Sequence, residues 1–299
     1  MVISEVPRPM TLSPTYELEI GPSPQSIEDY AVSTETQFHQ LLDANPSEQH
    51  IQNFLEQNPA LVPGARTPGS PSGHSPLHNA LITQPRLPGL RSKLPDFMWI
   101  GFHSLAWFPT LIEIERPDKQ IFRSDGVPRT EFTQARNQLA QWRAWFSQPT
   151  NVLTFIREYG VPEDVARHRS MKLHMILIYG RRYEFEGDSV KSNQRSALVT
   201  GADEELMSFD RLRVDKDLRD AITIRCNGSG DYRAVAVPPT FTLGPTFADR
   251  LAHIRGLGDA IRQANIEAER VEFLHRRLEY WRRWNANRGV GIINGADCE

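Results

Sequence analysis

The sequence has few cysteines and lacks any long apolar run. Only two of its 299 residues are cysteine, Cys226 and Cys298, and their separation does not fit a metal-binding pair. So little cysteine is typical of a reducing compartment and argues against a disulfide framework. No apolar run reaches the roughly 20 residues that a membrane-spanning helix needs, and residues 1–5 offer no basic start to a signal peptide. We therefore expect a cytoplasmic protein that does not associate with membranes.

An excess of charge of one sign is also missing. The chain carries 34 Lys and Arg against 37 Asp and Glu, a formal net charge of −3. Without a global basic excess, any affinity for nucleic acid must come from a local cluster of cations. The 39% hydrophobic and 24% charged residues are ordinary for a globular protein, and the length allows one large domain or two.

The residues that carry chemistry gather in the segment 94–117, LPDFMWIGFHSLAWFPTLIEIERP. Two apolar runs, 97–101 and 110–114, predict strands joined by an aromatic-rich turn. In an antiparallel hairpin the start of one strand lies opposite the end of the other. The pairing therefore predicts that Asp96 lies beside Glu113.

A third acid, Glu115, is expected at the same edge. Strand side chains alternate between faces, so Glu113 and Glu115 point the same way and Ile114 points into the core. Three converging carboxylates repel one another, and a divalent cation such as Mg2+, which prefers oxygen ligands, would relieve that repulsion. Acids at strand ends are also often solvated or ion-paired. Spacing alone leaves both interpretations open.

Two helices are predicted on either side of the hairpin. In the segment 45–48, NPSE, Asn serves as the N-cap, Pro takes the first helical position and Glu48 follows three residues after the cap. Glu48 is then either a capping-box residue or an acid facing the site. The segment 131–146 has an apolar stripe at helical spacing, with Gln138 beside it. Taken alone, Gln138 is more typical of an ordinary polar position beside a helix stripe.

The other predicted elements are shorter. The segment 15–20 could form a lone strand and 80–83 a short one, whereas 172–179 resembles a strand buried on both faces. A strand running into a helix is predicted at 205–212. The segments 221–226 and 232–237 flank an Asn-Gly-Ser-Gly turn, which indicates a hairpin. The last sixty residues are expected to be helical; their arginines and aromatics fit either a DNA surface or subunit packing.

Pro95-Asp96 followed by Glu113-Ile114-Glu115 resembles the signature of the PD-(D/E)XK nucleases. The resemblance implies that Asp96, Glu113 and the carbonyl of Ile114 hold Mg2+, with Mn2+ able to substitute, and that Glu48 adds a further ligand. Gln138 followed by Trp142 is similar to the Q-x-x-x-aromatic pattern of that superfamily.

One position departs from this signature, because Glu115 stands where the superfamily has a catalytic lysine. A carboxylate there could act as general base or bind a second metal ion. A lysine from another position, Lys93 or Lys119, could replace the missing one. The third alternative is loss of catalysis.

The order of several motifs resembles the Shedu family of prokaryotic antiphage nucleases over roughly residues 45 to 215. These motifs are FLEQNP, PDF, IEIERPDK, FRSDGVPRTEFTQARNQLAQWRAW, ILIYGRR and SFDRL. The resemblance implies an α/β fold with a restriction-endonuclease-like PD-(D/E)XK core, a mixed sheet flanked by helices and a helical C-terminal extension. It also implies Mg2+-dependent DNA cleavage of low sequence specificity in defence against phage, and assembly into homo-oligomers.

We therefore expect an N-terminal arm at 1–32, a nuclease domain at 33–240 and a helical extension at 241–299. The expected DNA contacts are Arg181, Arg182, Arg123 and Lys119. Three other functions stay open. The chain could be an inactive subunit of the same fold that binds DNA ends or regulates a partner, or a DNA repair nuclease. It could also be a scaffold in which the acids at the sheet edge have no catalytic role.

Overall fold

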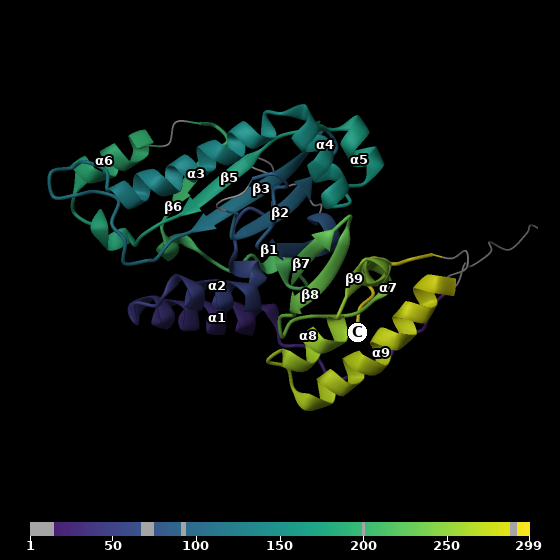
Figure 1. Cartoon of the computed structure of the whole chain (residues 1–299). Helices are drawn as coiled ribbons and strands as arrows, with labels where there is room; N and C mark the ends of the chain where they lie inside the picture. The colour runs from purple at the N-terminus through teal and green to yellow at the C-terminus, as the bar shows by residue number, and fades with distance from the viewer. Residues whose placement is uncertain (1–14, 67–74, 91–93, 199–200, 288–291) are drawn as a thin grey trace, which may run out of the picture.

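A mixed β-sheet flanked by helices organises the computed structural model, which describes residues 15–66, 75–90, 94–198, 201–287 and 292–299 (Figure 1). Within these residues the sheet has nine strands in the order β6-β5-β3-β2-β1-β7-β8-β9, and β4 also pairs with β3. The strands are β1 Ala80–Thr83, β2 Phe97–Phe102, β3 Ala106–Ile114, β4 Ser170–Met171, β5 His174–Ile178, β6 Glu204–Met207, β7 Ile222–Gly228, β8 Asp231–Ala236 and β9 Ile254–Arg255.

Helices cover both faces of the sheet, and short 3-10 turns connect several elements. In Figure 1, α3 and α4 lie on one face and α1 and α2 on the other. The α-helices are α1 Ile27–Asp43, α2 Glu48–Gln57, α3 Thr130–Phe146, α4 Pro149–Glu158, α5 Glu163–His168, α6 Ser189–Leu198, α7 Pro245–Ala248, α8 Leu257–Gln263 and α9 Ala268–Asn287. The 3-10 turns are η1 Pro59–Leu61, η2 Leu77–Asn79, η3 Arg182–Glu184, η4 Phe209–Arg211, η5 Lys216–Leu218 and η6 Asp249–Ala252.

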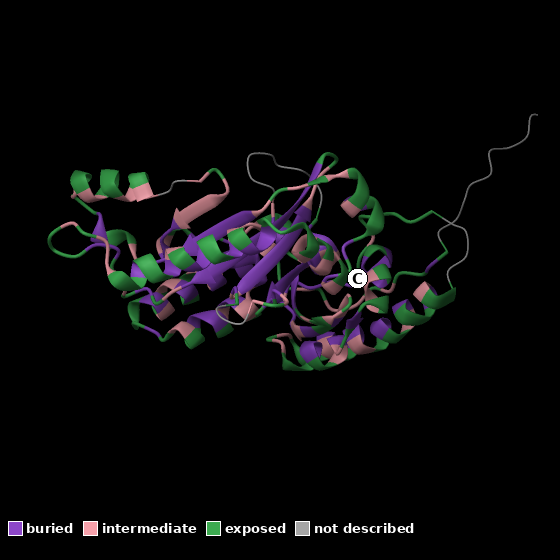
Figure 2. Cartoon of the chain, turned by 45° about the horizontal axis from the view of Figure 1, so that its top comes forward, coloured by how far each residue is buried: buried purple, intermediate pink, exposed green. Residues whose placement is uncertain are grey.

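The two central strands β3 and β5 are buried along their whole length (Figure 2). Alternate residues of β2 enter different cores: Phe97 and Trp99 pack on the side of α1 and α2, whereas Met98 and Ile100 pack on the side of α3. This division follows from the two-residue period of a strand. Burial on both faces explains why the central strands are nearly continuous apolar runs.

The predicted central hairpin is confirmed. β2 and β3 are antiparallel, with Phe97 opposite Ile112 and Phe102 opposite Trp107. The strand at 80–83, the buried strand at 172–179 and the hairpin of β7 and β8 are also present, the last two strands being antiparallel. The strand at 205–212 is found as β6, followed by the 3-10 turn η4. A mixed sheet with flanking helices is thus the observed architecture.

Three local predictions are wrong. The segment 15–20 forms no strand, and helix α1 begins at Ile27, within the segment 1–32 that was expected to be an arm. The helix starts earlier because the Ser26 hydroxyl caps it, accepting the N–H of Asp29 at 3.0 Å. The last sixty residues are not purely helical, since β9 pairs in parallel with β8 and extends the sheet. The sheet therefore crosses the boundary expected at residue 240.

The arginines of α9 are divided between packing and solvent. The guanidinium group of Arg277 is buried and binds the carboxylate of Glu299, whose Oε2 also accepts from Trp281 Nε1 at 3.0 Å. Arg270 is buried as well and donates to the backbone oxygen of Phe241 at 2.8 Å. These two arginines hold the helix against the rest of the chain. Throughout the described part of the chain, no helix is both long and apolar enough to cross a bilayer.

Candidate active site

The hairpin brings Asp96 and Glu113 together at one edge of β2 and β3. The N–H of Asp96 donates to the Ile112 oxygen at 3.0 Å, which continues the ladder one residue beyond β2. Its side chain turns back on β3, where Oδ2 accepts the N–H of Ile114 at 2.8 Å. The two carboxyl groups lie close enough to influence each other's pKa. The juxtaposition expected from the sequence is present.

Helix α3 supports this pair from above the sheet. Ile114 packs into the core on the side of α1 and α2, so Glu113 beside it faces α3, as the strand period requires. Gln138 of α3 is buried and hydrogen-bonds the Glu113 carboxyl. The amide therefore helps to fix the orientation of Glu113, although Glu113 Oε2 is buried and has no hydrogen-bond partner among the described residues.

The electrostatics of the pair are unfavourable for ionisation. Burial, and then the charges of Glu48 and Glu115, raise the pKa of Asp96 to about 7. Burial and the charge of Asp96 likewise raise the pKa of Glu113 well above its ordinary value. Within the part of the chain that the structure describes, neither carboxylate forms an ion pair with Lys, Arg or His. Two buried acids without a counterion are costly to ionise.

Glu48 joins the same electrostatic cluster from the start of α2. The predicted N-cap Asn45 is wrong: Asn45 takes a left-handed conformation, with φ 52°, and Ser47 caps the helix instead. Glu48 is therefore the first residue of α2, not the third, and it does not form a capping box. Burial and the charge of Glu115 raise the pKa of Glu48, whereas Lys119 lowers it.

Glu115 and Lys119 form an ion pair beside the two buried acids. The N–H of Glu115 donates to the Ile178 oxygen at 3.1 Å, which fixes its backbone at the end of β5. Lys119, four residues later, turns back to reach the carboxylate. Lys119 and Lys93 were the two lysines considered as replacements for the catalytic lysine of the superfamily. Of these, Lys119 lies at the acidic edge. Lys93 falls outside the described residues.

The expected DNA contacts differ in their surroundings. The Arg181 side chain is only 15% exposed, and Nε donates to Asp210 Oδ1 at 2.8 Å while its other nitrogens reach Asp43 at 3.3 Å. Arg182 is exposed at the surface. Arg123 is exposed too and pairs with Asp125. Arg181 therefore already holds two acids, whereas Arg182 and Arg123 present charge to solvent.

The sequence analysis did not single out Tyr179 and Arg129. A cavity of about 240 Å³ next to Lys119 is lined by both of them. The Tyr179 hydroxyl is buried without a partner, and burial and the charge of Glu115 raise its pKa. Tyr179 follows β5 directly, and sites in α/β sheets lie at the carboxyl ends of strands. Its position after the buried run at 172–179 was the available signal.

The donor set of this edge fits a hard divalent cation. Over the described ranges, no three His, Cys, Asp or Glu side chains form a preassembled metal-binding group. Mg2+ commonly binds through one or two carboxylates, with water and substrate phosphate as its other ligands. Asp96 and Glu113 supply two adjacent carboxylates, and the unpartnered Oε2 of Glu113 is available as a ligand. The residues present therefore match that mode of binding.

Comparison with protein families gives one match and two negative results. Residues 45–213 match the family described as Shedu protein SduA, C-terminal. No curated protein and no solved structure matches the chain. The matched segment contains all four acids at the edge and Gln138, and it ends before β7.

Proposed function

Because the chain belongs to the Shedu SduA C-terminal family of antiphage defence proteins, we propose that it is a metal-dependent DNA endonuclease. The acidic edge of β2 and β3 would be its active site. We assign the sheet and helices around this edge to a PD-(D/E)XK core. The reaction would nick or cut phosphodiester bonds with Mg2+, and Mn2+ would substitute.

The observation that carries this proposal is the buried Asp96 and Glu113 pair without a counterion. Raised carboxyl pKa values at a defined site are a physical sign of function. Binding a divalent cation would remove the mutual repulsion and satisfy the unpartnered Oε2 of Glu113. A purely structural role gives no reason to keep two such acids together.

We propose Asp96 and Glu113 as the metal ligands, with the Ile114 carbonyl and Glu48 as further ones. A bound Mg2+ would stabilise negative charge on the phosphate and acidify a water. Glu115 would accept the proton of the attacking water as general base. Its ion-pair partner Lys119 would orient that carboxylate. Lys119 would also stand in for the lysine that the superfamily places at the position of Glu115.

Other residues would hold the DNA backbone. Gln138 fixes the orientation of Glu113 through its hydrogen bond. The exposed cations Arg182 and Arg123, together with Lys119, would contact phosphates, which position DNA but carry no sequence information. Arg181 would act by holding its loop in place through Asp210. Recognition of DNA structure or ends is thus favoured over recognition of a base sequence, and a homo-oligomer would be the working form.

A second candidate is a catalytically inactive subunit that binds DNA ends. The glutamate at position 115, where the superfamily has lysine, is the observation that favours it. Such a protein would bind DNA equally well with and without an intact acidic edge. The same fold working as a DNA repair nuclease would share the chemistry and differ only in its substrate.

The test is cleavage of plasmid and linear DNA by the wild type and by Glu113→Ala, with Mg2+, with Mn2+ and with EDTA. Glu163→Ala is a matched control, because Glu163 is exposed and pairs only with its helix neighbour Arg167. We expect metal-dependent cleavage by the wild type and the control, and none by Glu113→Ala. Equal cleavage by Glu113→Ala would refute the assignment of the site. DNA binding without cleavage by the folded wild type would favour the inactive subunit.

A further inference from the structure

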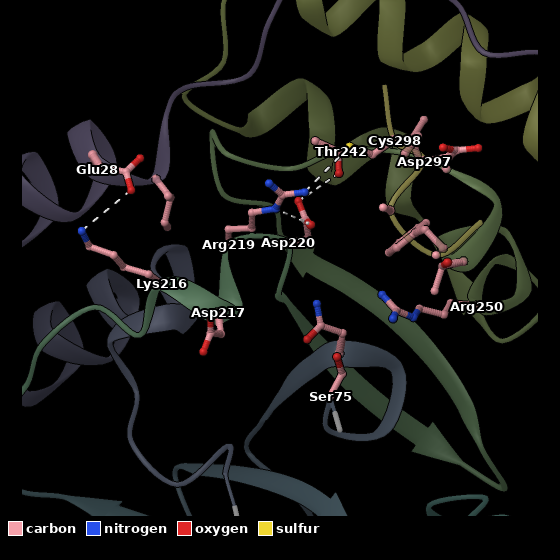
Figure 3. Close-up of a pocket in the computed structure, with 18 residues that line it drawn as sticks. Glu28, Ser75, Lys216, Asp217, Arg219, Asp220, Thr242, Arg250, Asp297 and Cys298 are labelled. Carbon is pink, nitrogen blue, oxygen red and sulfur yellow. Dashed lines mark hydrogen bonds and ion pairs between the residues drawn. The ribbon is translucent and has the colours of Figure 1, made fainter. Parts of the chain in front are cut away.

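A second cavity, of about 570 Å³, lies apart from the acidic edge (Figure 3). Its walls come from the start of α1, the loop before β1, the segment from η5 to β7, the turn after β8 with α7 and η6, and residues 295–298. Only Ser75 and Asn79 of its lining fall within the segment that matches the Shedu family. A volume of this size accommodates a small organic molecule.

The acids in the walls already have partners. Asp220 pairs with Arg219 at 3.1 Å and accepts from the Thr242 hydroxyl at 3.0 Å, contacts that Figure 3 shows across the back of the cavity. Asp297 accepts from the hydroxyl of Tyr16 at 2.6 Å. Glu28 and Asp217 form ion pairs with Lys216 and Arg66. Glu28, Asp217 and Asp220 are thus ion-paired within the protein, whereas Asp297 keeps its charge and is hydrogen-bonded by a neutral hydroxyl.

Two residues that line this cavity have polar groups without hydrogen-bond partners among the described residues. Asn79 is 6% exposed, and its Oδ1 is buried without a hydrogen bond. Among the residues that the structure describes, nothing hydrogen-bonds or ion-pairs with the Arg250 guanidinium, which lies 5.4 Å from the centre of the Phe247 ring. Figure 3 shows Arg250 extending toward the middle of the cavity, on the side of Ser75. Burial lowers the pKa of Arg250, and the charges of Asp220 and Asp249 act in the opposite direction.

These groups define the chemistry of a ligand. The planar fork of a guanidinium group matches the oxygens of a phosphate or carboxylate. An unpartnered amide oxygen needs a hydroxyl or N–H donor. The hydroxyl groups and carboxylates of the remaining lining are hydrogen-bond acceptors and suit a molecule rich in hydroxyl groups. A buried polar group without a partner is unfavourable, so a ligand that satisfies both groups gains affinity from each of them.

We propose that this cavity binds a small phosphorylated sugar, with the phosphate on Arg250 and a sugar hydroxyl donating to Asn79. The same chemistry occurs in a free sugar phosphate and in a mononucleotide. The site is separate from the proposed active site and does not depend on nuclease activity.

The test is isothermal titration of the full chain with ribose 5-phosphate, AMP, inorganic phosphate and ribose. Arg250→Met removes the cation, Arg250→Lys keeps the charge without the fork, and Arg225→Met is the control because Arg225 is exposed on β7. We expect ribose 5-phosphate or AMP to bind more tightly than inorganic phosphate or ribose. The affinity should fall at least about tenfold in Arg250→Met, less in Arg250→Lys and not at all in the control.

The relative affinity of the two phosphorylated probes decides the source of the sugar. Tighter binding of AMP would identify a nucleotide, and tighter binding of ribose 5-phosphate a free sugar phosphate. Arg250→Lys, which keeps a cation in the same place, provides a folded variant if Arg250→Met does not fold. Absence of binding by the wild type at ~10 mM probe would overturn the proposal. Binding that is unchanged in both Arg250 variants would overturn it too.

Discussion

Replacing Glu113 with glutamine keeps the size of the side chain and removes one charge from the buried acid pair. In the wild type, the pKa of Asp96 rises from 3.8 to about 7, and that of Glu113 moves in the same direction. A carboxyl group with a higher pKa in the folded than in the unfolded state stabilises the fold while protonated. That stability is fully present below about pH 4 and is lost as the pH rises through the folded pKa.

The pKa shift of Asp96 gives the scale of these effects on the free energy of unfolding. For Asp96 it is about 3 pKa units, from 3.8 to about 7, and at 1.36 kcal/mol per unit this corresponds to ~4 kcal/mol. Burial is the first cause and is still present in the variant. The hydrogen bond from Glu113 lowers the pKa of Asp96, so the gain in the variant comes from Glu113 itself, whose own pKa is raised by burial and by the charge of Asp96. Because glutamine carries no charge, we expect Glu113→Gln to raise the free energy of unfolding by ~1–2 kcal/mol at pH 8. Because the pKa of Glu113 is raised, more of this carboxyl group is protonated at pH 5 than at pH 8, so the difference between the variant and the wild type should be smaller at pH 5.

The assay is chemical unfolding in EDTA at pH 5 and pH 8, repeated with Mg2+ at pH 8. Glu163→Gln is the control for an exposed glutamate. Mg2+ should stabilise the wild type and the control but not Glu113→Gln, and the same variant should lose DNA cleavage. A variant that is more stable yet inactive is the signature of a functional site held at a cost in stability. Equal destabilisation of Glu113→Gln at both pH values would refute this reasoning.

Three further predictions follow from the same contacts. Mg2+ binding should tighten from pH 6 to pH 8 and release protons, because Asp96 must lose its proton to bind the metal. Calorimetry in buffers of different ionisation enthalpy measures the number of protons released. Binding of Mg2+ without proton release would contradict this prediction. Lys119→Gln should reduce the cleavage rate at least about tenfold, because it removes the ion-pair partner of Glu115. Single-turnover kinetics would measure this, and an unchanged rate would contradict it. Arg181→Gln should lower the free energy of unfolding by ~1–3 kcal/mol by breaking its hydrogen bonds to acids. By fluorescence anisotropy, it should weaken DNA binding less than Arg182→Gln does.

The local arrangement of the candidate active site was accessible from the sequence. The alternation of apolar and acidic residues around Ile114 predicted which face each glutamate takes, and the structure has Ile114 in the core with Glu113 opposite. The apolar stripe at 131–146 predicted α3, and the resemblance of Gln138 and Trp142 to the Q-x-x-x-aromatic pattern implied a place for Gln138 near the acids. The strand faces and the helix stripe could be predicted because each is a repeating pattern within one strand or helix, or between two neighbouring ones.

Errors occurred where two local signals compete. Asn45 and Ser47 are both good capping residues, and the choice of Ser47 depends on Asn45 taking a left-handed conformation. The strand β9 has only two residues, and it exists because β8 offers an edge for pairing. Neither the N-cap residue of α2 nor the strand β9 is determined by residue propensity, because each depends on the neighbouring backbone.

The sequence by itself determined the central hairpin, the helices beside it and the set of acids at its end. These depend on periodicity over a few residues and on hydrogen bonds between adjacent strands. Only the tertiary structure decided that Lys119 pairs with Glu115, that Tyr179 has no partner, and that Arg250 and Asn79 face one cavity. Asn79 and Arg250 are far apart in the chain, and their meeting depends on how β1, β7 and the C-terminal segments pack. No periodic pattern encodes such a contact, because its free energy comes from the whole packed core.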